Sequence, residues 1–243
     1  MNDLRIRLGR ASPLIIGLII VMIFALVCAG VYLGDRYAQH RAEHRVATAL
    51  QPHLGTQEPP QVDIQGFPFL TQVIVGSVGE MHIVADQLGI TTNAPVTLAH
   101  ADLVMADVAT TDWFKTMKIT HTEGTGLLDY TKLSALARAP LTYGGEGRVQ
   151  IVHKTTVFGR EVDAVITGAP RLDADGQTMT LSDAKISVAG VNLPDFTAQA
   201  LLAALLKPIP LKSMPIGLTV LSIEAAEDGL HLSLVGDNQT ISS

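Results

Sequence analysis

The hydrophobic pattern of the chain begins with one uninterrupted apolar run. The segment PLIIGLIIVMIFALVCAGVYL extends from Pro13 to Leu33 and contains no charged residue. About twenty apolar residues are enough to cross the hydrocarbon core of a bilayer as a helix, in which the backbone polar groups bond to one another. Ser12 suits the N-cap of such a helix, and Pro13 suits its first position. The pattern therefore predicts a transmembrane helix over residues 13–34, preceded by a short cytoplasmic segment over residues 1–12.

Basic residues flank this run on both sides and bear on its orientation. Equal numbers of arginines lie on the two sides, namely Arg5, Arg7 and Arg10 before it and Arg36, Arg41 and Arg45 after it. The N-terminal amine adds a positive charge to the short side, and long domains translocate largely regardless of their charge. We therefore expect a single-pass signal anchor with the bulk of the chain on the extracytoplasmic, periplasmic side. The alternative is a signal peptide cleaved after Ala29.

A helical pattern continues beyond the membrane run. Ala38, Ala42, Val46 and Leu50 recur at helical spacing, and Pro52 interrupts the pattern. The residues that follow, HLGTQEPPQ, have the composition of a linker stiffened by two prolines. We therefore expect a juxtamembrane helix and linker over residues 35–61. One extracytoplasmic domain then occupies residues 62–243.

Within that domain, apolar and polar residues alternate with a period of two, which is typical of antiparallel sheet. Two Asp-Gly pairs, Asp175-Gly176 and Asp228-Gly229, separate alternating segments and predict tight hairpins. The sequence therefore predicts a mainly antiparallel α+β fold.

Two short helices interrupt the alternation, one from Asp129 to Arg138 and one from about Pro194 to Leu206. The second, DFTAQALLAALL, has almost no polar face. Such a helix is either buried nearly all round or borders an apolar ligand. At twelve residues it is too short to span a bilayer.

Charge and cysteine content narrow the function classes. After residues 1–34 are removed, the chain carries 22 acidic and 14 basic side chains, a net charge of -8. This surface repels nucleic acid. The single cysteine, Cys28, lies in the apolar run, so the sequence offers no intrachain disulfide and no thiolate metal cluster.

Candidate catalytic motifs are weak. His40-Arg41-Ala42-Glu43-His44 has the spacing of an inverted zinc-protease motif, but the arginines beside it oppose a dication and no third ligand is evident. Gly76-Ser77-Val78-Gly79 is one residue short of a hydrolase elbow. Asp173-Ala174-Asp175-Gly176 starts like a calcium loop but lacks its later ligands. The sequence predicts no enzyme, no metal and no cofactor, and a zinc hydrolase built on His40 and His44 stays a minor hypothesis.

The segment VDIQGFPFLTQ, residues 62–72, is the most distinctive. Gly66 and Pro68 within an apolar stretch predict an edge strand, a bulge or a bend. Together with GTGLLDYTKLSALA at residues 124–137, LTYGGEGRVQIVHKTTVFGREVDAVITG at 141–168 and IPLKSMPIGLTVLSIEAAEDGLHLSLVG at 209–236, it resembles the LmeA-like phospholipid-binding family of actinobacterial envelope proteins. The resemblance covers nearly everything after the apolar run.

The resemblance implies a TULIP-like fold, in which a long curved sheet wraps a helix and holds acyl chains in an apolar groove. It also implies a role in envelope mannolipid (lipomannan-type) biosynthesis or lipid transport, with phospholipid and the cell membrane as partners. An envelope glycosyltransferase is a further expected partner. The alternative is a non-catalytic scaffold or accessory subunit of such an enzyme.

Acyl-chain burial depends on apolar area, because each buried methylene contributes about 0.8 kcal/mol. The expected lipid-lining residues are therefore apolar side chains from three segments: Phe67, Phe69, Leu70, Leu201, Leu202, Leu205, Met214 and Ile216. Arg36, Arg41 and Arg45 are the expected headgroup contacts, since the predicted anchor holds them near the membrane surface.

Overall fold

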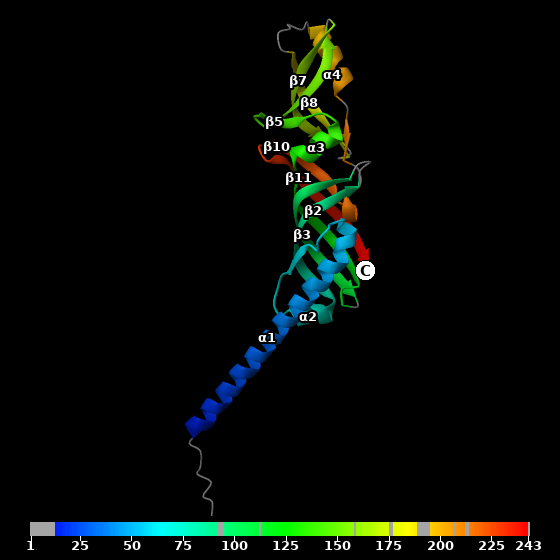
Figure 1. Ribbon diagram of the computed structural model, residues 1–243. Helices are drawn as coiled ribbons and strands as arrows, with labels where there is room; N and C mark the ends of the chain where they lie inside the picture. Colours follow the sequence, from blue (N-terminus) through cyan, green and yellow to red (C-terminus); the bar gives the residue numbers. More distant parts are fainter. Residues whose placement is uncertain are drawn as a thin grey trace, which may run out of the picture.

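The computed structural model describes residues 13–91, 95–111, 113–157, 159–174, 177–188, 195–206, 208–211 and 214–242. The molecule is elongated, with two antiparallel sheets following one another along its length (Figure 1). A long helix, α1 (Pro13–Leu54), enters at one end and packs against the first sheet. We call this sheet with residues 35–54 of α1 the proximal half, and the second sheet with helix α4 the distal half.

The proximal sheet has six strands in the order β1-β2-β3-β4-β11-β10. Their bounds are β1 (Gln61–Ile64), β2 (Ser77–Thr91), β3 (Pro95–Thr111), β4 (Thr116–Leu128), β10 (Thr219–Ala226) and β11 (Gly229–Ser242). β11 pairs with β4 although most of the distal half lies between them in sequence. The chain thus leaves the proximal sheet after β4 and returns with β10 and β11, joined by the predicted Asp228-Gly229 turn, which the pairing confirms.

Residues 35–54 of α1 form part of the proximal core. Ala42, Val46, Leu50 and Leu54 recur every four residues, lie on one helical face and are buried. Opposite them, alternate residues of β2 and β3, such as Ile83 and Leu103, are fully buried. The helix continues through Pro52 and ends at Leu54, two residues beyond the predicted stop.

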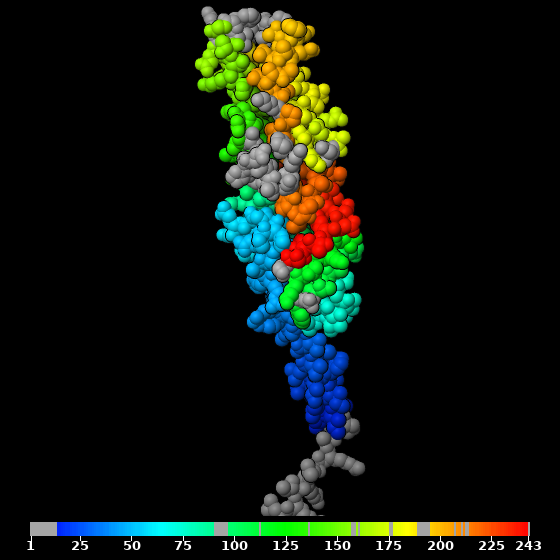
Figure 2. Space-filling model, turned by 90° about the vertical axis from the view of Figure 1, so that its right-hand side faces the viewer, coloured from blue at the N-terminus to red at the C-terminus, as the bar shows by residue number. Residues whose placement is uncertain are grey.

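The distal sheet has five strands in the order β5-β6-β7-β8-β9. Their bounds are β5 (Leu141–Gly145), β6 (Arg148–Val157), β7 (Arg160–Leu172), β8 (Thr178–Val188) and β9 (Ile209–Pro210). β7 and β8 pair antiparallel, with Leu172 opposite Met179, while the predicted turn residues Asp175 and Gly176 lie outside the described residues. Helix α4 (Asp195–Leu205) lies beside β8, and their orange and yellow atoms adjoin at the far end of the molecule in Figure 2.

The helix predicted after Asp129 is present as α3 (Tyr130–Ala137), where the two halves meet (Figure 1). The Asp129 carboxylate accepts a hydrogen bond from the backbone N–H of Lys132 at 2.8 Å, which is the geometry of an N-cap. A 3-10 turn, η1 (Pro215–Gly217), precedes β10. The predicted α+β, mainly antiparallel class is confirmed, with the strands divided between two sheets.

One helix was not predicted, α2 (Phe69–Val75). The bend expected at residues 62–72 is present, because Gly66 has a φ of 106° and the Phe67–Pro68 bond is cis. The chain then turns into a helix that ends at Gly76, whose left-handed φ of 77° suits a C-cap. Seven residues rich in β-branched side chains carry too little helical periodicity to be recognised in the sequence.

Candidate functional site

The inner face of the distal sheet is apolar across three strands. Ile151, Ile166 and Ile186 lie directly opposite one another on β6, β7 and β8, and Ala164 opposes Val188 in the next row on the same face. We call these five residues the distal apolar face. Ile166, Ala164 and Val188 are buried but are not members of the main hydrophobic core. That core extends from α1 and the proximal sheet to Val149 and Met179 of the distal half, and Ile151 packs against it.

Helix α4 lies beside β8 and is itself poorly covered. Leu201, Leu202 and Leu205 form a half-buried stripe at helical spacing, and α4 contacts β8. None of its residues is fully buried, and Phe196 is 82% exposed. The helix is therefore not buried all round, so the first of the two expectations for its composition does not hold.

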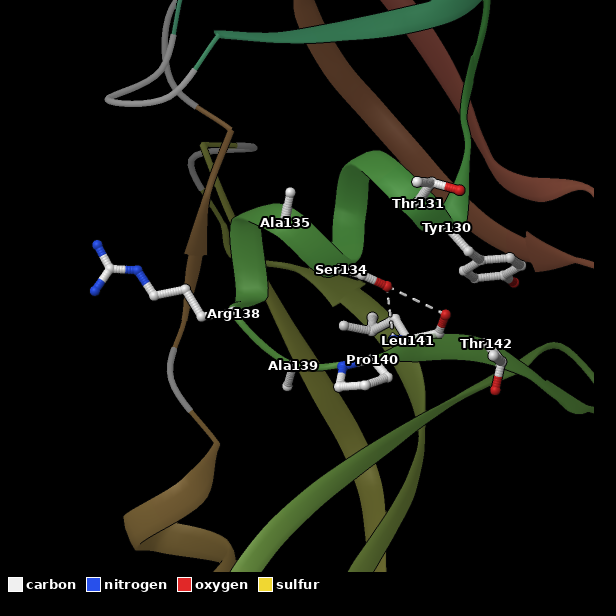
Figure 3. Close-up of a pocket in the computed structure, with 9 residues that line it drawn as sticks. All are labelled: Tyr130, Thr131, Ser134, Ala135, Arg138, Ala139, Pro140, Leu141 and Thr142. Atoms are coloured by element: carbon white, nitrogen blue, oxygen red, sulfur yellow. Dashed lines mark hydrogen bonds between the residues drawn. The ribbon is translucent and has the colours of Figure 1, made fainter.

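A hollow lies where the two halves meet. It has a volume of about 640 Å³ and is lined by α3 and the start of β5 (Figure 3). The Ser134 hydroxyl accepts a hydrogen bond from the backbone N–H of Leu141 at 2.8 Å, which fixes the loop at its floor. Arg138 projects away from the hollow in Figure 3. The lining residues that the structure describes include no carboxylate, histidine or cysteine.

Tyr130 at the rim of this hollow has a structural function. Its hydroxyl donates a hydrogen bond to the backbone carbonyl of Ala226 on β10 at 2.7 Å. Burial, with smaller effects from Tyr143 and Asp228, raises the pKa of Tyr130 to about 12. The phenol therefore remains protonated and able to donate at neutral pH, and it links α3 to the proximal sheet.

The predicted lining residues occupy three separate regions. Phe69 is fully buried and stacks on Phe114 with ring centroids 6.3 Å apart, whereas Phe67 and Leu70 are exposed at the base of the proximal half. Leu201, Leu202 and Leu205 lie on α4 in the distal half. Met214 is buried and Ile216 is half-buried in the segment that packs against α1 and β11. The structure does not bring these eight residues into one groove.

The residues of the distal apolar face were not among the predicted lining residues. Their alternation was visible in the sequence, for example at Ala164 and Ile166. However, period-two alternation does not reveal which face lies near α4, because that depends on how the sheet meets the helix.

The three predicted headgroup arginines are exposed along α1 just beyond its apolar run. Arg36 lies over the Tyr32 ring at 5.7 Å, and Arg41 lies over the Tyr37 ring at 5.3 Å and donates to its hydroxyl. A hydrogen bond with Tyr32 is the main cause of a raised pKa for Arg36. Stacking on tyrosine leaves both guanidinium groups near the end of the apolar run.

Glu43, the glutamate of the His40–His44 motif, has a structural role. Glu43 Oε1 accepts hydrogen bonds from Gln39 at 3.0 Å and from the Ile64 backbone at 3.3 Å, while Oε2 pairs with His40 at 2.9 Å. The carboxylate thus attaches β1 to α1. Among the described residues, no group of three or more His, Cys, Asp or Glu side chains is arranged to hold a metal ion.

Comparison with known proteins adds one finding to this geometry. α1 is the one helix among the described residues that is long and apolar enough to cross a membrane. Searches of curated proteins and of solved structures found no match. A family model for LmeA-like phospholipid-binding proteins, a lipid-binding and non-catalytic kind of domain, matches residues 33–235. The match starts at the end of the apolar run and includes both halves, and the chain therefore belongs to the LmeA-like phospholipid-binding family.

Proposed function

We propose that this protein is a membrane-anchored, extracytoplasmic phospholipid-binding protein that holds acyl chains in its distal half, between α4 and the distal apolar face. The observation that carries this proposal is that α4, although almost entirely apolar, has no fully buried residue. Burying one methylene contributes about 0.8 kcal/mol, so acyl chains laid along this surface stabilise the complex without any specific polar contact.

In this proposal, membrane anchoring and lipid binding are carried out by opposite ends of the molecule. α1 anchors the chain, and the distal half receives lipid at the opposite end of the molecule (Figure 1). No proton transfer or bond cleavage is required of any residue. We further propose that the bound lipid serves envelope lipid or mannolipid biosynthesis, by transport or by presentation to a glycosyltransferase.

The test uses the full chain in nanodiscs that contain a photoactivatable phospholipid, with crosslinked peptides mapped by mass spectrometry. Crosslinks are expected on α4 and on β6 to β8. In the variant Leu201→Asp/Leu205→Asp, two carboxylates face the proposed acyl chains, and burying unpaired charge is costly. Crosslinking to the distal half should therefore be lost. Circular dichroism should remain unchanged, because water can solvate both groups in an open groove.

The matched control is Ala200→Asp/Ala204→Asp, which adds the same charges at the same spacing on the exposed side of α4. It should retain crosslinking. Full crosslinking in the leucine variant would place the site elsewhere. Two results together would favour the non-catalytic scaffold. The distal half of the wild-type chain would acquire no crosslinks, and the leucine variant would unfold.

A shortened version for such work should retain residues 35–54. A truncation at Val62 would remove Ala42, Val46, Leu50 and Leu54, all buried in the proximal core. The resulting loss of apolar contacts would expose the face of β2 and β3 to water.

A further inference from the structure

Exposed apolar side chains gather at the base of the proximal half, the end from which the apolar part of α1 departs. They are Phe67 (58% exposed), Leu70 (37%), Ile74 (85%), Val75 (74%) and Trp113 (53%), which we call the basal apolar cluster. Outside α1, the described residues include seven large apolar side chains that are exposed, and five of them belong to this cluster. Such a concentration on one surface marks a contact with a partner or a membrane.

α2, which carries most of the cluster, is held rigidly against α1. The Asp35 carboxylate is buried, with 1% of the residue exposed, and accepts hydrogen bonds from the backbone N–H groups of Phe69 at 2.9 Å and Leu70 at 2.8 Å. The rings of Tyr32 and Phe67 are 5.8 Å apart. Charge-assisted bonds to backbone donors are among the stronger hydrogen bonds in proteins. The cluster is therefore fixed at the level of residues 32–35 of α1.

The turn between β3 and β4 is held beside α2. Phe114 stacks on Phe69, and the Thr110 N–H donates to the Gly76 carbonyl at 2.9 Å. Trp113 and Phe114 both have left-handed backbone conformations, with φ of 55° and 66°. This conformation is strained for bulky residues and persists only where the surroundings enforce it. Here it buries Phe114 and leaves Trp113 exposed next to α2.

The level of the cluster coincides with the end of the apolar run of α1, which extends to Leu33. Residues 64–79, which include α2, contain no charged side chain. Tryptophan and tyrosine favour the interface between acyl chains and headgroups, and Trp113, Tyr32 and Tyr37 are all exposed at this end. An uncharged α2 segment with aromatic residues around it, at the end of a helix long and apolar enough to span a membrane, fits the boundary between acyl chains and headgroups better than it fits water.

We infer that the basal apolar cluster docks into the headgroup and acyl boundary of the bilayer that α1 spans, as a second membrane contact. The inference rests on the membrane anchoring proposed above, and it does not depend on which side of the membrane the domain occupies. A single helix leaves a domain free to tilt, whereas a second contact at α2 fixes its orientation. The distal half then stands away from the membrane, because it lies at the opposite end of the molecule (Figure 1).

The test exploits Trp113, the single tryptophan of the chain. Full-length protein is reconstituted in nanodiscs of phospholipids brominated near the headgroup end of the acyl chain. Trp113 fluorescence should be strongly quenched relative to nanodiscs without bromine and should resist aqueous iodide. A control, Trp113→Phe/Leu221→Trp, moves the indole to an exposed site on β10 and should show the reverse pattern. Quenching of Trp113 by iodide but not by brominated lipid would overturn the inference.

Variants test whether α2 drives the contact. Ile74→Asp/Val75→Asp alters two of the most exposed residues of the cluster, so the fold should persist by circular dichroism while lipid quenching of Trp113 is lost. Leu221→Asp is the matched charge control and should leave quenching unchanged. Unchanged quenching in the α2 variant would also overturn the inference.

Alkaline carbonate extraction of native membranes separates this inference from the anchor itself. A chain that resists extraction but shows no lipid quenching lacks only the second contact. A chain released by carbonate lacks the anchor as well, and both proposals then fail.

Discussion

The proximal and distal halves both consist of antiparallel strands, but the helix that packs against each sheet is buried to a different extent. In the proximal half, α1 inserts an unbroken line of buried residues, from Ala42 to Leu54, against strands whose inward side chains are fully buried. In the distal half, α4 lies against β8 with its leucines only half-buried. A filled interior leaves no room for a ligand, whereas an incompletely covered apolar surface gains free energy when an acyl chain covers it. This contrast supports the proposal that the proximal half is the support and that acyl chains lie along α4 in the distal half.

The sharpest test of this difference compares one leucine from each half. Leu50→Ala removes a fully buried side chain of α1, and such changes typically cost 2 to 5 kcal/mol, roughly, because a cavity remains. Leu202→Ala on α4 should cost only about 1 kcal/mol, since its side chain is already partly in water. Denaturant unfolding of the full chain in detergent measures both. Equal losses would show that α4 is part of a filled core and would remove the contrast.

One hydrogen bond ties α3, at the junction of the two halves, to β10 of the proximal sheet. Tyr130→Phe leaves the Ala226 carbonyl without its donor and should reduce the free energy of unfolding by about 1 kcal/mol. Because the pKa of Tyr130 is raised from 10.0 to about 12, the stability it contributes is complete below pH 10 and is lost as pH rises through about 12. Unfolding midpoints measured from pH 9 upwards should fall more steeply in wild type than in Tyr130→Phe. Parallel curves would contradict this.

The smallest effect concerns the outer face of the proximal sheet, where His121 faces Asp237 at 2.6 Å and Glu123 at 3.9 Å. The hydrogen bond that the His121 ring makes to the Asp237 carboxylate raises the pKa of His121 above its ordinary value of 6.5. The pair therefore stabilises the fold fully below about pH 6.5, and this contribution is lost as pH rises through the higher folded pKa. Asp237→Asn should lower the pKa of His121 in an NMR titration, with little effect on unfolding at pH 8. An unchanged titration would exclude Asp237 as the cause.

Several elements could be predicted from sequence because their signals are local. The apolar run from Pro13 to Leu33, the capped helix after Asp129 and the Asp228-Gly229 hairpin each depend on neighbouring residues alone. α2 could not be predicted, since its N-terminus is capped by Asp35, more than thirty residues away in the chain. The exposed residues of α2 indicate a membrane contact only because the fold places them beside the end of the apolar run of α1.

Some features of the candidate site were likewise visible in the sequence, and others required the tertiary structure. The apolar composition of α4 was evident in the sequence and indicated either burial or an apolar ligand. The exposure of that helix, and the rows of Ile151, Ile166 and Ile186 across three strands, required the tertiary structure. Phe67, Leu201 and Met214 were grouped by composition, but the fold separates them.

The sequence by itself determined that the chain has an apolar segment long enough to span a membrane, a mainly antiparallel fold and an excess of acidic residues, because these follow from run length, periodicity and composition. Only the tertiary structure decided that residues 35–54 take part in the core while no residue of α4 is fully buried. The physical reason is that burial depends on what packs against a side chain. Apolar side chains at helical spacing are buried on α1, whereas those on α4 stay half-exposed.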